Sequence, residues 1–172
     1  MAQAEPFTRQ HKIRVSVEDE LPVVRVDARA VAEVIYTLID NAAKYAPPET
    51  LIAIEANRVA DEMIEIAVED QGPGIPSHLR ERVFERFYRA TGNGASGGHT
   101  SGIGMGLAIA KGIVEAHSGR IWIEDGTAGR GARIVFTVPV GDEDLPRDTD
   151  VKARQAATLD ERKTEDLSTN GE

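Results

Sequence analysis

Three glycines before an apolar segment mark the first candidate site in this sequence. Gly102, Gly104 and Gly106 recur at every second position, directly ahead of a helical pattern that ends near His117. Glycines let a backbone approach a ligand closely, and the free N–H groups of a helix N-terminus attract anions. This pattern favours a phosphate-binding loop, and a flexible loop ahead of a core helix is the competing interpretation.

Two familiar phosphate-binding motifs do not fit this loop. A dinucleotide fingerprint requires G-x-G-x-x-G directly after a strand, but Leu107 stands near the place of the third glycine, and the preceding "RATGNGASGGHTSG" is small, polar and glycine-rich. A Walker A loop requires Lys-Ser or Lys-Thr after its last glycine, and neither follows Gly106. The nature of the loop therefore depends on the rest of the chain.

Polar residues at helical spacing form a second candidate site. Glu33, Thr37 and Asn41 are spaced i, i+4 and i+8, so they share one face of a predicted helix, which Lys44 and Tyr45 continue. An asparagine oxygen is a hard ligand that suits Mg²⁺, and Mg²⁺ commonly bridges a protein to nucleotide phosphates. The alternative is an ordinary solvent-exposed helix face.

A carboxylate followed by glycines forms a third candidate. In "DQGPGIP", Asp70 ends an apolar strand and is able to accept a hydrogen bond from an exocyclic amine such as adenine N6. Gly72 and Gly74 would let a base lie against the backbone. A plain turn with a polar first residue is the alternative.

An aromatic, arginine-bearing stretch, "VFERFYRA", precedes the glycine-rich loop. We interpret Phe84 and Phe87 as hydrophobic anchors of that loop. Arg86 and Arg89 lie where the loop begins, and a guanidinium there is able to reach a terminal phosphate.

The elements that must position these residues follow from periodicity and turn residues. A helix is expected from Ala28 to about Ala46 with Asp27 as its N-cap, and its apolar face carries Val31, Val34, Ile35, Leu38 and Ala42. Ser77 is expected to cap a short helix to about Phe84, and a third helix runs to about His117 with Gly119 ending it. Strands are expected at residues 11–19, 51–59, 62–70, 120–125 and 132–140.

The first of these strands alternates, with Ile13, Val15 and Val17 on one face, and we expect it to be half-buried. The second and third strands should form a hairpin around residues 60–62. Together the elements predict an α+β fold, a two-layer α/β sandwich in which a mixed sheet of about five strands carries three helices on one face.

Composition limits the partners. The 172 residues carry a formal net charge of −9, which argues against nucleic acid, and the absence of cysteine excludes disulfides and thiolate metal sites. The sequence has neither a signal-peptide pattern nor an apolar run long enough to span a membrane, so we expect a cytoplasmic chain without membrane contact. Residues 1–10 are expected to be a linker, 11–140 the domain, and 141–172 a disordered charged tail.

The order of the motifs resembles the catalytic ATP-binding domain of sensor histidine kinases, which have the GHKL or Bergerat fold also found in Hsp90, DNA gyrase and MutL. "TLIDNAAKY" is similar to the N box, "DQGPGIP" to the G1 box, "VFERFYRA" to the F box and "GIGMGLAIAKGIVEAHSG" to the G2 box. The resemblance covers residues 11 to 140. Among these kinases, the sequence is most similar to the potassium-responsive type.

The resemblance implies a Mg-ATP site. Asn41 would be the Mg²⁺ ligand, Asp70 would bind adenine N6 with Gly72 and Gly74, and Tyr45 would line the base pocket. The phosphate end would involve Lys44, Gly102, Gly104, Gly106 and Leu107, with Arg89 near the γ-phosphate. Glu33 would polarise the attacking histidine. Two departures from the family pattern are Thr37, where a first asparagine is common, and Ala132, where a Thr or Ser is usual.

The acceptor histidine is expected on another domain. His11, His78, His99 and His117 all lack the helical acceptor pattern with a following acid, so we interpret them as structural or solvated. The resemblance then implies transfer of the γ-phosphoryl group of ATP to a histidine on a dimerisation domain absent from this chain, and only indirectly to a response regulator. Two alternatives remain: an anti-sigma-factor-type serine kinase and a non-catalytic ATP-binding regulatory module.

Overall fold

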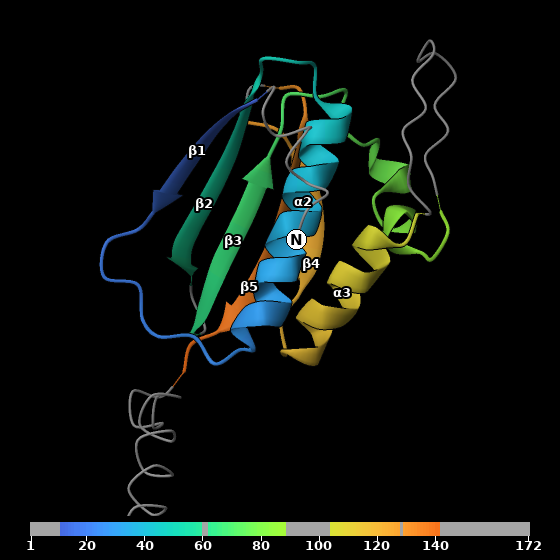
Figure 1. Ribbon diagram of the computed structural model, residues 1–172. Helices are drawn as coiled ribbons and strands as arrows, with labels where there is room; N and C mark the ends of the chain where they lie inside the picture. The colour runs from blue at the N-terminus through green and yellow to red at the C-terminus, as the bar shows by residue number, and fades with distance from the viewer. Residues whose placement is uncertain (1–10, 60–61, 89–103, 128, 142–172) are drawn as a thin grey trace, which may run out of the picture. The chain divides into compact units, whose positions relative to one another are not determined.

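The computed structural model describes residues 11–59, 62–88, 104–127 and 129–141, which form one sheet with helices on one side (Figure 1). The five strands are β1 (Lys12–Val17), β2 (Leu51–Val59), β3 (Met63–Glu69), β4 (Ile121–Asp125) and β5 (Ala132–Pro139). Their order is β1-β2-β3-β5-β4; β1 pairs with β2 in parallel, and the other pairs are antiparallel. The predicted mixed five-stranded sheet and the hairpin of β2 and β3 are confirmed.

Helix α2 (Ala28–Tyr45) crosses the middle of the sheet and carries much of the core. Asp27 caps it as predicted, because its carboxylate accepts hydrogen bonds from the N–H groups of Arg29 and Ala30. The predicted apolar face is also confirmed, since Val34 and Leu38 are completely buried. Pro47 follows the C-cap residue, which is extended, and so ends the helix.

Helix α3 (Gly106–Ala116) packs beside α2 on the same face of the sheet (Figure 1). The expected helix end at Gly119 needs a correction, because Ser118 has the left-handed φ of 60°. Gly119 is instead held against β5: a Cβ atom on it would lie 2.0 Å from the carbonyl oxygen of Thr137.

The short helix expected from Ser77 consists of two single 3-10 turns, η1 (Ser77–Leu79) and η2 (Arg82–Phe84). Ser77 does not cap it, because the N-cap position is Pro76 and no side chain makes a capping hydrogen bond. Phe84 is buried, as an anchor should be, but Phe87 is 67% exposed, so the prediction of an anchoring role for Phe87 was wrong. The predicted linker, most of the glycine-rich loop (89–103) and the tail from 142 lie outside the described residues.

Strand β1 is not half-buried as its alternation predicts. All six of its residues are exposed, because β1 forms an edge of the sheet and the helices pack against the other four strands rather than against β1. Alternation identifies the two faces of a strand, but it does not reveal whether an element covers the apolar one.

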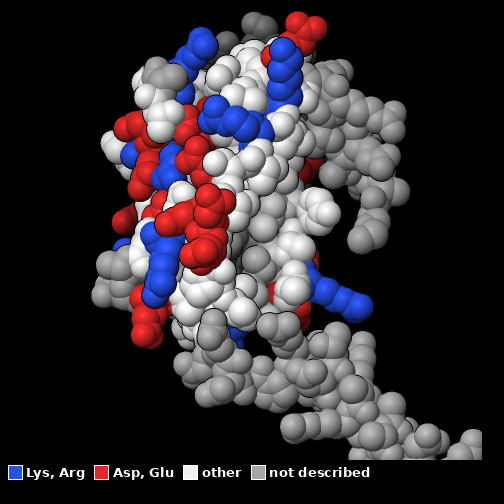
Figure 2. Space-filling model, turned by 90° about the vertical axis from the view of Figure 1, so that its left-hand side faces the viewer, with Lys and Arg blue, Asp and Glu red and all other residues white. Residues whose placement is uncertain are grey.

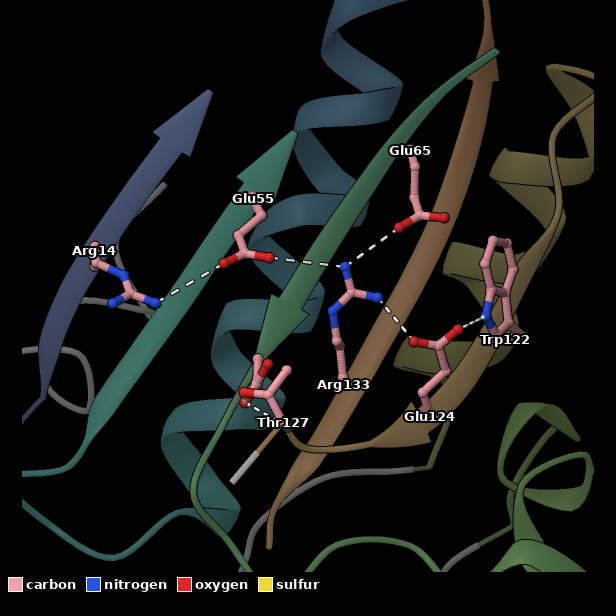
Figure 3. A network of polar contacts seen from close by, with 8 residues as sticks. Arg14, Glu55, Glu65, Trp122, Glu124, Thr127 and Arg133 are labelled. Carbon is pink, nitrogen blue, oxygen red and sulfur yellow. Dashed lines mark hydrogen bonds and ion pairs between the residues drawn. The ribbon is translucent and has the colours of Figure 1, made fainter. Parts of the chain in front are cut away.

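The sheet face opposite the helices carries a network of ion pairs, and no other described helix or strand covers it (Figure 3). Arg133 on β5 bonds Glu124 at 2.8 Å and Glu65 at 3.3 Å, and it lies 3.8 Å from Glu55. Trp122 donates its indole N–H to Glu124 at 2.7 Å. That hydrogen bond, with Arg133 beside it, lowers the pKa of Glu124. These side chains bridge four neighbouring strands, so charge pairing holds the solvent-facing layer together.

Within the described residues, no helix has both the length and the apolar character needed to cross a membrane.

Two glycine-to-alanine substitutions test the packing of α3. Gly119→Ala should lower the free energy of unfolding by at least about 2 kcal/mol, because the new methyl group overlaps the backbone of β5. Gly112→Ala is the matched control: apart from the backbone of its own helix and its chain neighbours, nothing lies within 4 Å of its Cβ position, so it should stabilise the helix by about 0.5–1 kcal/mol. Urea denaturation measures both effects. Equal stability of the two variants would show that α3 does not end against β5 in this way.

Candidate nucleotide site

Asp70 lies at the C-terminal end of β3 and is 7% exposed. Its Oδ1 atom accepts hydrogen bonds from the backbone N–H of Gly72 at 2.7 Å and of Ala132 at 3.3 Å. Among the described residues, no group donates to the second oxygen, Oδ2. The carboxylate is therefore anchored by one oxygen and retains an acceptor for a ligand with an amine.

The environment of Asp70 opposes its ionisation. Burial raises the pKa of this carboxyl above the usual value of 3.8, and the N–H donors of Gly72 and Ala132 only partly offset that rise. Ionisation of Asp70 in the folded protein therefore costs stability. Perturbed buried carboxyls of this kind gather at functional sites, which agrees with a binding role.

The glycines after Asp70 are required by the protein itself. A Cβ atom on Gly72 would lie 2.9 Å from both Asp70 Oδ1 and the carbonyl oxygen of Tyr45, and one on Gly74 would lie 2.8 Å from the carbonyl oxygen of Gly131. Gly74 and Gly131 also have left-handed φ values of 74° and 86°. Close backbone packing explains why these positions are glycine, and their contact with a base stays a prediction.

Gly131 was missed by sequence reasoning. Its Cβ would lie 1.9 Å from the carbonyl oxygen of Asp70, so the turn before β5 presses directly on the end of β3. The pattern G-R-G-A at residues 129–132 was the available signal, because two glycines so close to a strand start often mark a close backbone approach.

Asn41 lies on α2, one turn before Tyr45, whose carbonyl lies against the Gly72 position in the loop after Asp70. Its amide nitrogen is the only buried side-chain nitrogen or oxygen among the described residues that lacks a hydrogen-bond partner. A half-turn flip of the side-chain amide exchanges its nitrogen and oxygen. The atom without a partner is therefore either an N–H donor to a phosphate or an oxygen ligand of a metal. Asn41 therefore fits the predicted Mg²⁺-nucleotide site.

Lys44 and Tyr45, which follow Asn41 on α2, do not direct buried side chains toward that site. The ammonium group of Lys44 forms an ion pair with Asp40 one turn earlier on α2, so it must leave this partner to contact a phosphate. The side chain of Tyr45 is 56% exposed, while its carbonyl contacts the Gly72 position. The backbone of Tyr45 thus lies against the loop that follows Asp70, whereas the ammonium group of Lys44 is held by Asp40.

The N-terminus of α3 faces the same side of α2. A Cβ on Gly106, the first residue of α3, would lie 3.1 Å from the methyl group of Thr37, which is one turn from Asn41. Gly104 has φ 72° and accepts a hydrogen bond from the Phe87 N–H at 3.0 Å. Leu107 packs against the core. A phosphate at the end of α3 would therefore lie close to the Asn41 face.

Arg80 holds the loop that follows Asp70, and sequence reasoning did not identify it. Its Nε donates to the carbonyl of Ile75 at 3.0 Å, and its guanidinium pairs with Asp125 at the end of β4. Arg80 thus ties the Gly/Pro loop to the sheet edge. A hollow of about 330 Å³ lies beside this clamp, but neither Asp70 nor Asn41 lines it.

The remaining predicted residues are less defined. Glu33 is exposed on the same face of α2 as Thr37 and Asn41, two turns from Asn41. Arg89 and Gly102 lie outside the described residues. No group of three or more His, Cys, Asp or Glu side chains capable of holding a metal occurs in the described ranges.

Two of the four histidines have structural roles, as predicted. His117 accepts a hydrogen bond from the Asp27 N–H at 3.0 Å, and its other ring nitrogen lies 2.8 Å from the carbonyl of Ile113. His11 contacts the carbonyl of Ala43 at 3.2 Å. His78 lies in η1, and His99 is outside the described residues.

Comparison with known proteins places these features in one family. Residues 26–142 match the family described as histidine kinase-, DNA gyrase B-, and HSP90-like ATPase. The adaptive-response sensory kinase SasA of Nostoc sp. is 36% identical over 77% of this chain, and the sensor histidine kinase WalK of Bacillus subtilis is 40% identical over 70% of it. The matched regions span only 32% and 19% of those two proteins.

Solved structures agree with the sequence relatives. The mycobacterial sensor histidine kinase MprB superposes with a TM-score of 0.64 at 29% identity, over 77% of this chain and 83% of the other. The catalytic domain of the histidine kinase ThkA shows the same fold with a TM-score of 0.64 at 24% identity, over 77% of this chain and 82% of the other.

The raised pKa of Asp70 predicts a pH-dependent gain from Asp70→Asn. The amide keeps an acceptor oxygen for Gly72 and Ala132 but carries no charge, so at about pH 7 the variant should unfold at a higher temperature than the parent protein. The gap should shrink as the pH falls through the folded-state pKa of Asp70, because the parent carboxyl then becomes neutral too.

Thermal unfolding followed from about pH 7 to about pH 4 measures this gap. Asp19→Asn, at an exposed carboxylate, is the control and should leave the midpoint nearly unchanged. A lower midpoint for Asp70→Asn throughout the range would show that charged hydrogen bonds at Asp70 outweigh its burial.

Proposed function

Because this chain belongs to the histidine kinase-, DNA gyrase B- and HSP90-like ATPase family, we propose that it binds Mg-ATP as the catalytic domain of a sensor histidine kinase. Two polar groups with free hydrogen-bonding capacity carry the proposal: the second carboxylate oxygen of Asp70, which accepts no hydrogen bond from the described residues, and the buried amide nitrogen of Asn41. They lie on elements that pack together, Asn41 on α2 and Asp70 at the end of β3, and the carbonyl of Tyr45 at the end of α2 lies against the Gly72 position.

We infer that Asp70 recognises adenine. Its free carboxylate oxygen is an acceptor, and the exocyclic N6 amine of adenine is a donor, whereas guanine presents a carbonyl oxygen at the corresponding position. Tyr45 would lie beside the base, and Gly72 and Gly74 keep the adjoining backbone free of side chains. Ala132 supplies only a backbone N–H where related kinases have a hydroxyl, so the base would be held with one polar side chain fewer.

The phosphates would lie between α2 and the N-terminus of α3. Asn41 would provide the metal-binding oxygen, and a bound Mg²⁺ supplies neutralisation of the phosphate charge. The backbone around Gly104 and Gly106 and the N-terminal N–H groups of α3 would contact phosphate oxygens, with Lys44 released from Asp40. We also assign Gly102, Leu107 and Arg89 to this end of the site.

The proposed reaction moves the γ-phosphoryl group of ATP to a ring nitrogen of a histidine, and ADP leaves. Positioning and charge stabilisation provide most of the catalysis in such reactions. Glu33, exposed on the face of α2 that carries Asn41, would accept a hydrogen bond from the other ring nitrogen and so hold the attacking one unprotonated. The acceptor would be presented by a dimerisation domain, and a response regulator would receive the group afterwards.

The domain bounds are proposed as residues 11–140, with 1–10 and 141–172 as flanking segments. The relatives give no support to the potassium-responsive subtype that the sequence resembles. They also do not favour the serine-kinase or non-catalytic alternatives, because SasA, WalK, MprB and ThkA are all described as sensory or histidine kinases.

Nucleotide selectivity tests the role of Asp70. Calorimetry in the presence of Mg²⁺ should show binding of ATP and much weaker binding of GTP, because guanine would place an acceptor against the carboxylate. Asp70→Asn should weaken ATP binding by about 10- to 100-fold, since a carboxylate acceptor is lost. Asp19→Asn again serves as the control. Equal affinity of the parent protein for ATP and GTP would refute the adenine assignment.

Phosphoryl transfer tests Glu33. With radiolabelled ATP and a separately purified dimerisation domain of a related sensor kinase, the chain should produce acid-labile label on that domain and none on itself. Glu33→Ala should reduce this transfer by about 100-fold or more while ATP affinity changes little, because the proposed contact is with the acceptor. Acid-stable label on the partner would support the serine-kinase alternative, and equal losses of binding and transfer would show that Glu33 acts on the nucleotide.

A further inference from the structure

Strand β1 exposes an apolar row at the edge of the sheet. Ile13, Val15 and Val17 are 47%, 63% and 57% exposed. They lie on the helix side of the sheet, because the parallel register places Ile13 beside Ile52, which is completely buried. At the other sheet edge, Ile121 and Trp122 of β4 are partly buried and Ile123 is buried, so β1 is the exposed edge.

The same three residues direct their backbone groups away from the sheet. The N–H groups of Lys12 and Glu18 donate to the carbonyls of Thr50 and Ala56 on the β2 side, at 3.1 and 2.9 Å. In a parallel pair the bonded residues alternate, so the even-numbered residues of β1 face β2. The N–H and C=O groups of Ile13, Val15 and Val17 therefore form the free edge, and no described element lies outside it (Figure 1).

Charge changes sign along this edge. Lys12 and Arg14 lie at its start, and Glu18, Asp19 and Glu20 follow its end. When the strand is aligned antiparallel to itself around Val15, Ile13 faces Val17 and Lys12 faces Glu18. The free N–H and C=O groups of Ile13, Val15 and Val17 in one copy then face the same groups in the other copy. They are in the register in which opposite residues of an antiparallel pair hydrogen-bond to each other.

We propose that β1 is a self-association edge, at which two copies of this chain pair antiparallel about Val15 to form one continuous sheet. Such a contact is isologous, because each copy contributes the same surface. Side chains directly opposite in an antiparallel pair share a face, so both apolar rows lie on the helix side. There they continue the apolar face of β2, on which Ile52 is completely buried and Ile54 is partly buried against the core.

A second copy fits this edge better than an unrelated strand because apolar side chains, backbone groups and charges all match under one two-fold axis. Figure 2, which views the molecule from the β1 side, shows charged side chains gathered on one side of this edge and a largely uncharged surface on the other. Within one copy, Glu18 accepts a hydrogen bond from the Arg58 N–H at 2.6 Å, so its carboxylate would be shared with Lys12 of the second copy.

A charge-reversal cycle on the full 172-residue chain tests the register. Sedimentation equilibrium should show a monomer–dimer equilibrium for the parent protein. Lys12→Glu and Glu18→Lys should each weaken the dimer by about tenfold, because each places like charges opposite one another twice. The double variant Lys12→Glu/Glu18→Lys should regain the parent affinity, whereas losses caused by altered folding would add up instead.

A substitution on the two-fold axis tests the centre of the contact. Val15→Lys should make the chain monomeric while leaving its thermal midpoint nearly unchanged, because residue 15 is exposed in one copy and opposes itself in two. Ile109→Lys, at a 46% exposed apolar position on α3, is the matched control and should leave dimerisation intact. A parent protein that stays monomeric at all concentrations, or a dimer insensitive to Val15→Lys, would overturn the proposal.

Discussion

One buried carboxylate connects the separate parts of this structure. Asp70 joins the end of β3 to the start of β5 through the N–H of Ala132, and to its own loop through the N–H of Gly72. The backbone of Gly131 presses on its carbonyl, and the end of α2 lies against Gly72. The strand, loop and helix ends that would surround a nucleotide are thus positioned around a group that burial disfavours as an anion. The site is built at the expense of local stability, as is common where function requires an unsatisfied polar group.

Local sequence signals were sufficient for the elements that pack against something. The Asp27 cap and the Val34–Leu38 stripe predict α2 almost to the residue, and the alternation of β2 and β3 predicts their hairpin. The order of the motifs was sufficient for the family, because four short patterns in a fixed sequence are far more specific than any one of them. The roles of individual site residues remain proposals, since they depend on a ligand rather than on packing.

The failures concern features that only tertiary contacts decide. The alternation of β1 and the aromatic ring of Phe87 both suggested burial, but whether an apolar residue is covered depends on which element lies over it. Gly119 looked like a helix terminator, yet its role is to let α3 approach β5. Gly131 and Arg80 were missed because the strand end and the loop that they hold come from distant parts of the chain.

The pairing of β3 with β5 gives the fold a late assembly step. These central strands are adjacent in space, but the loop after Asp70, both 3-10 turns, α3 and β4 separate them along the chain. Closing so long a loop is slow compared with forming α2 or the β2–β3 hairpin. Since Asp70 acquires its Ala132 contact only when β5 arrives, a chain still emerging from the ribosome would lack part of the site that we propose for adenine. Nucleotide would then distinguish finished molecules from nascent ones and shift the population toward the former by mass action.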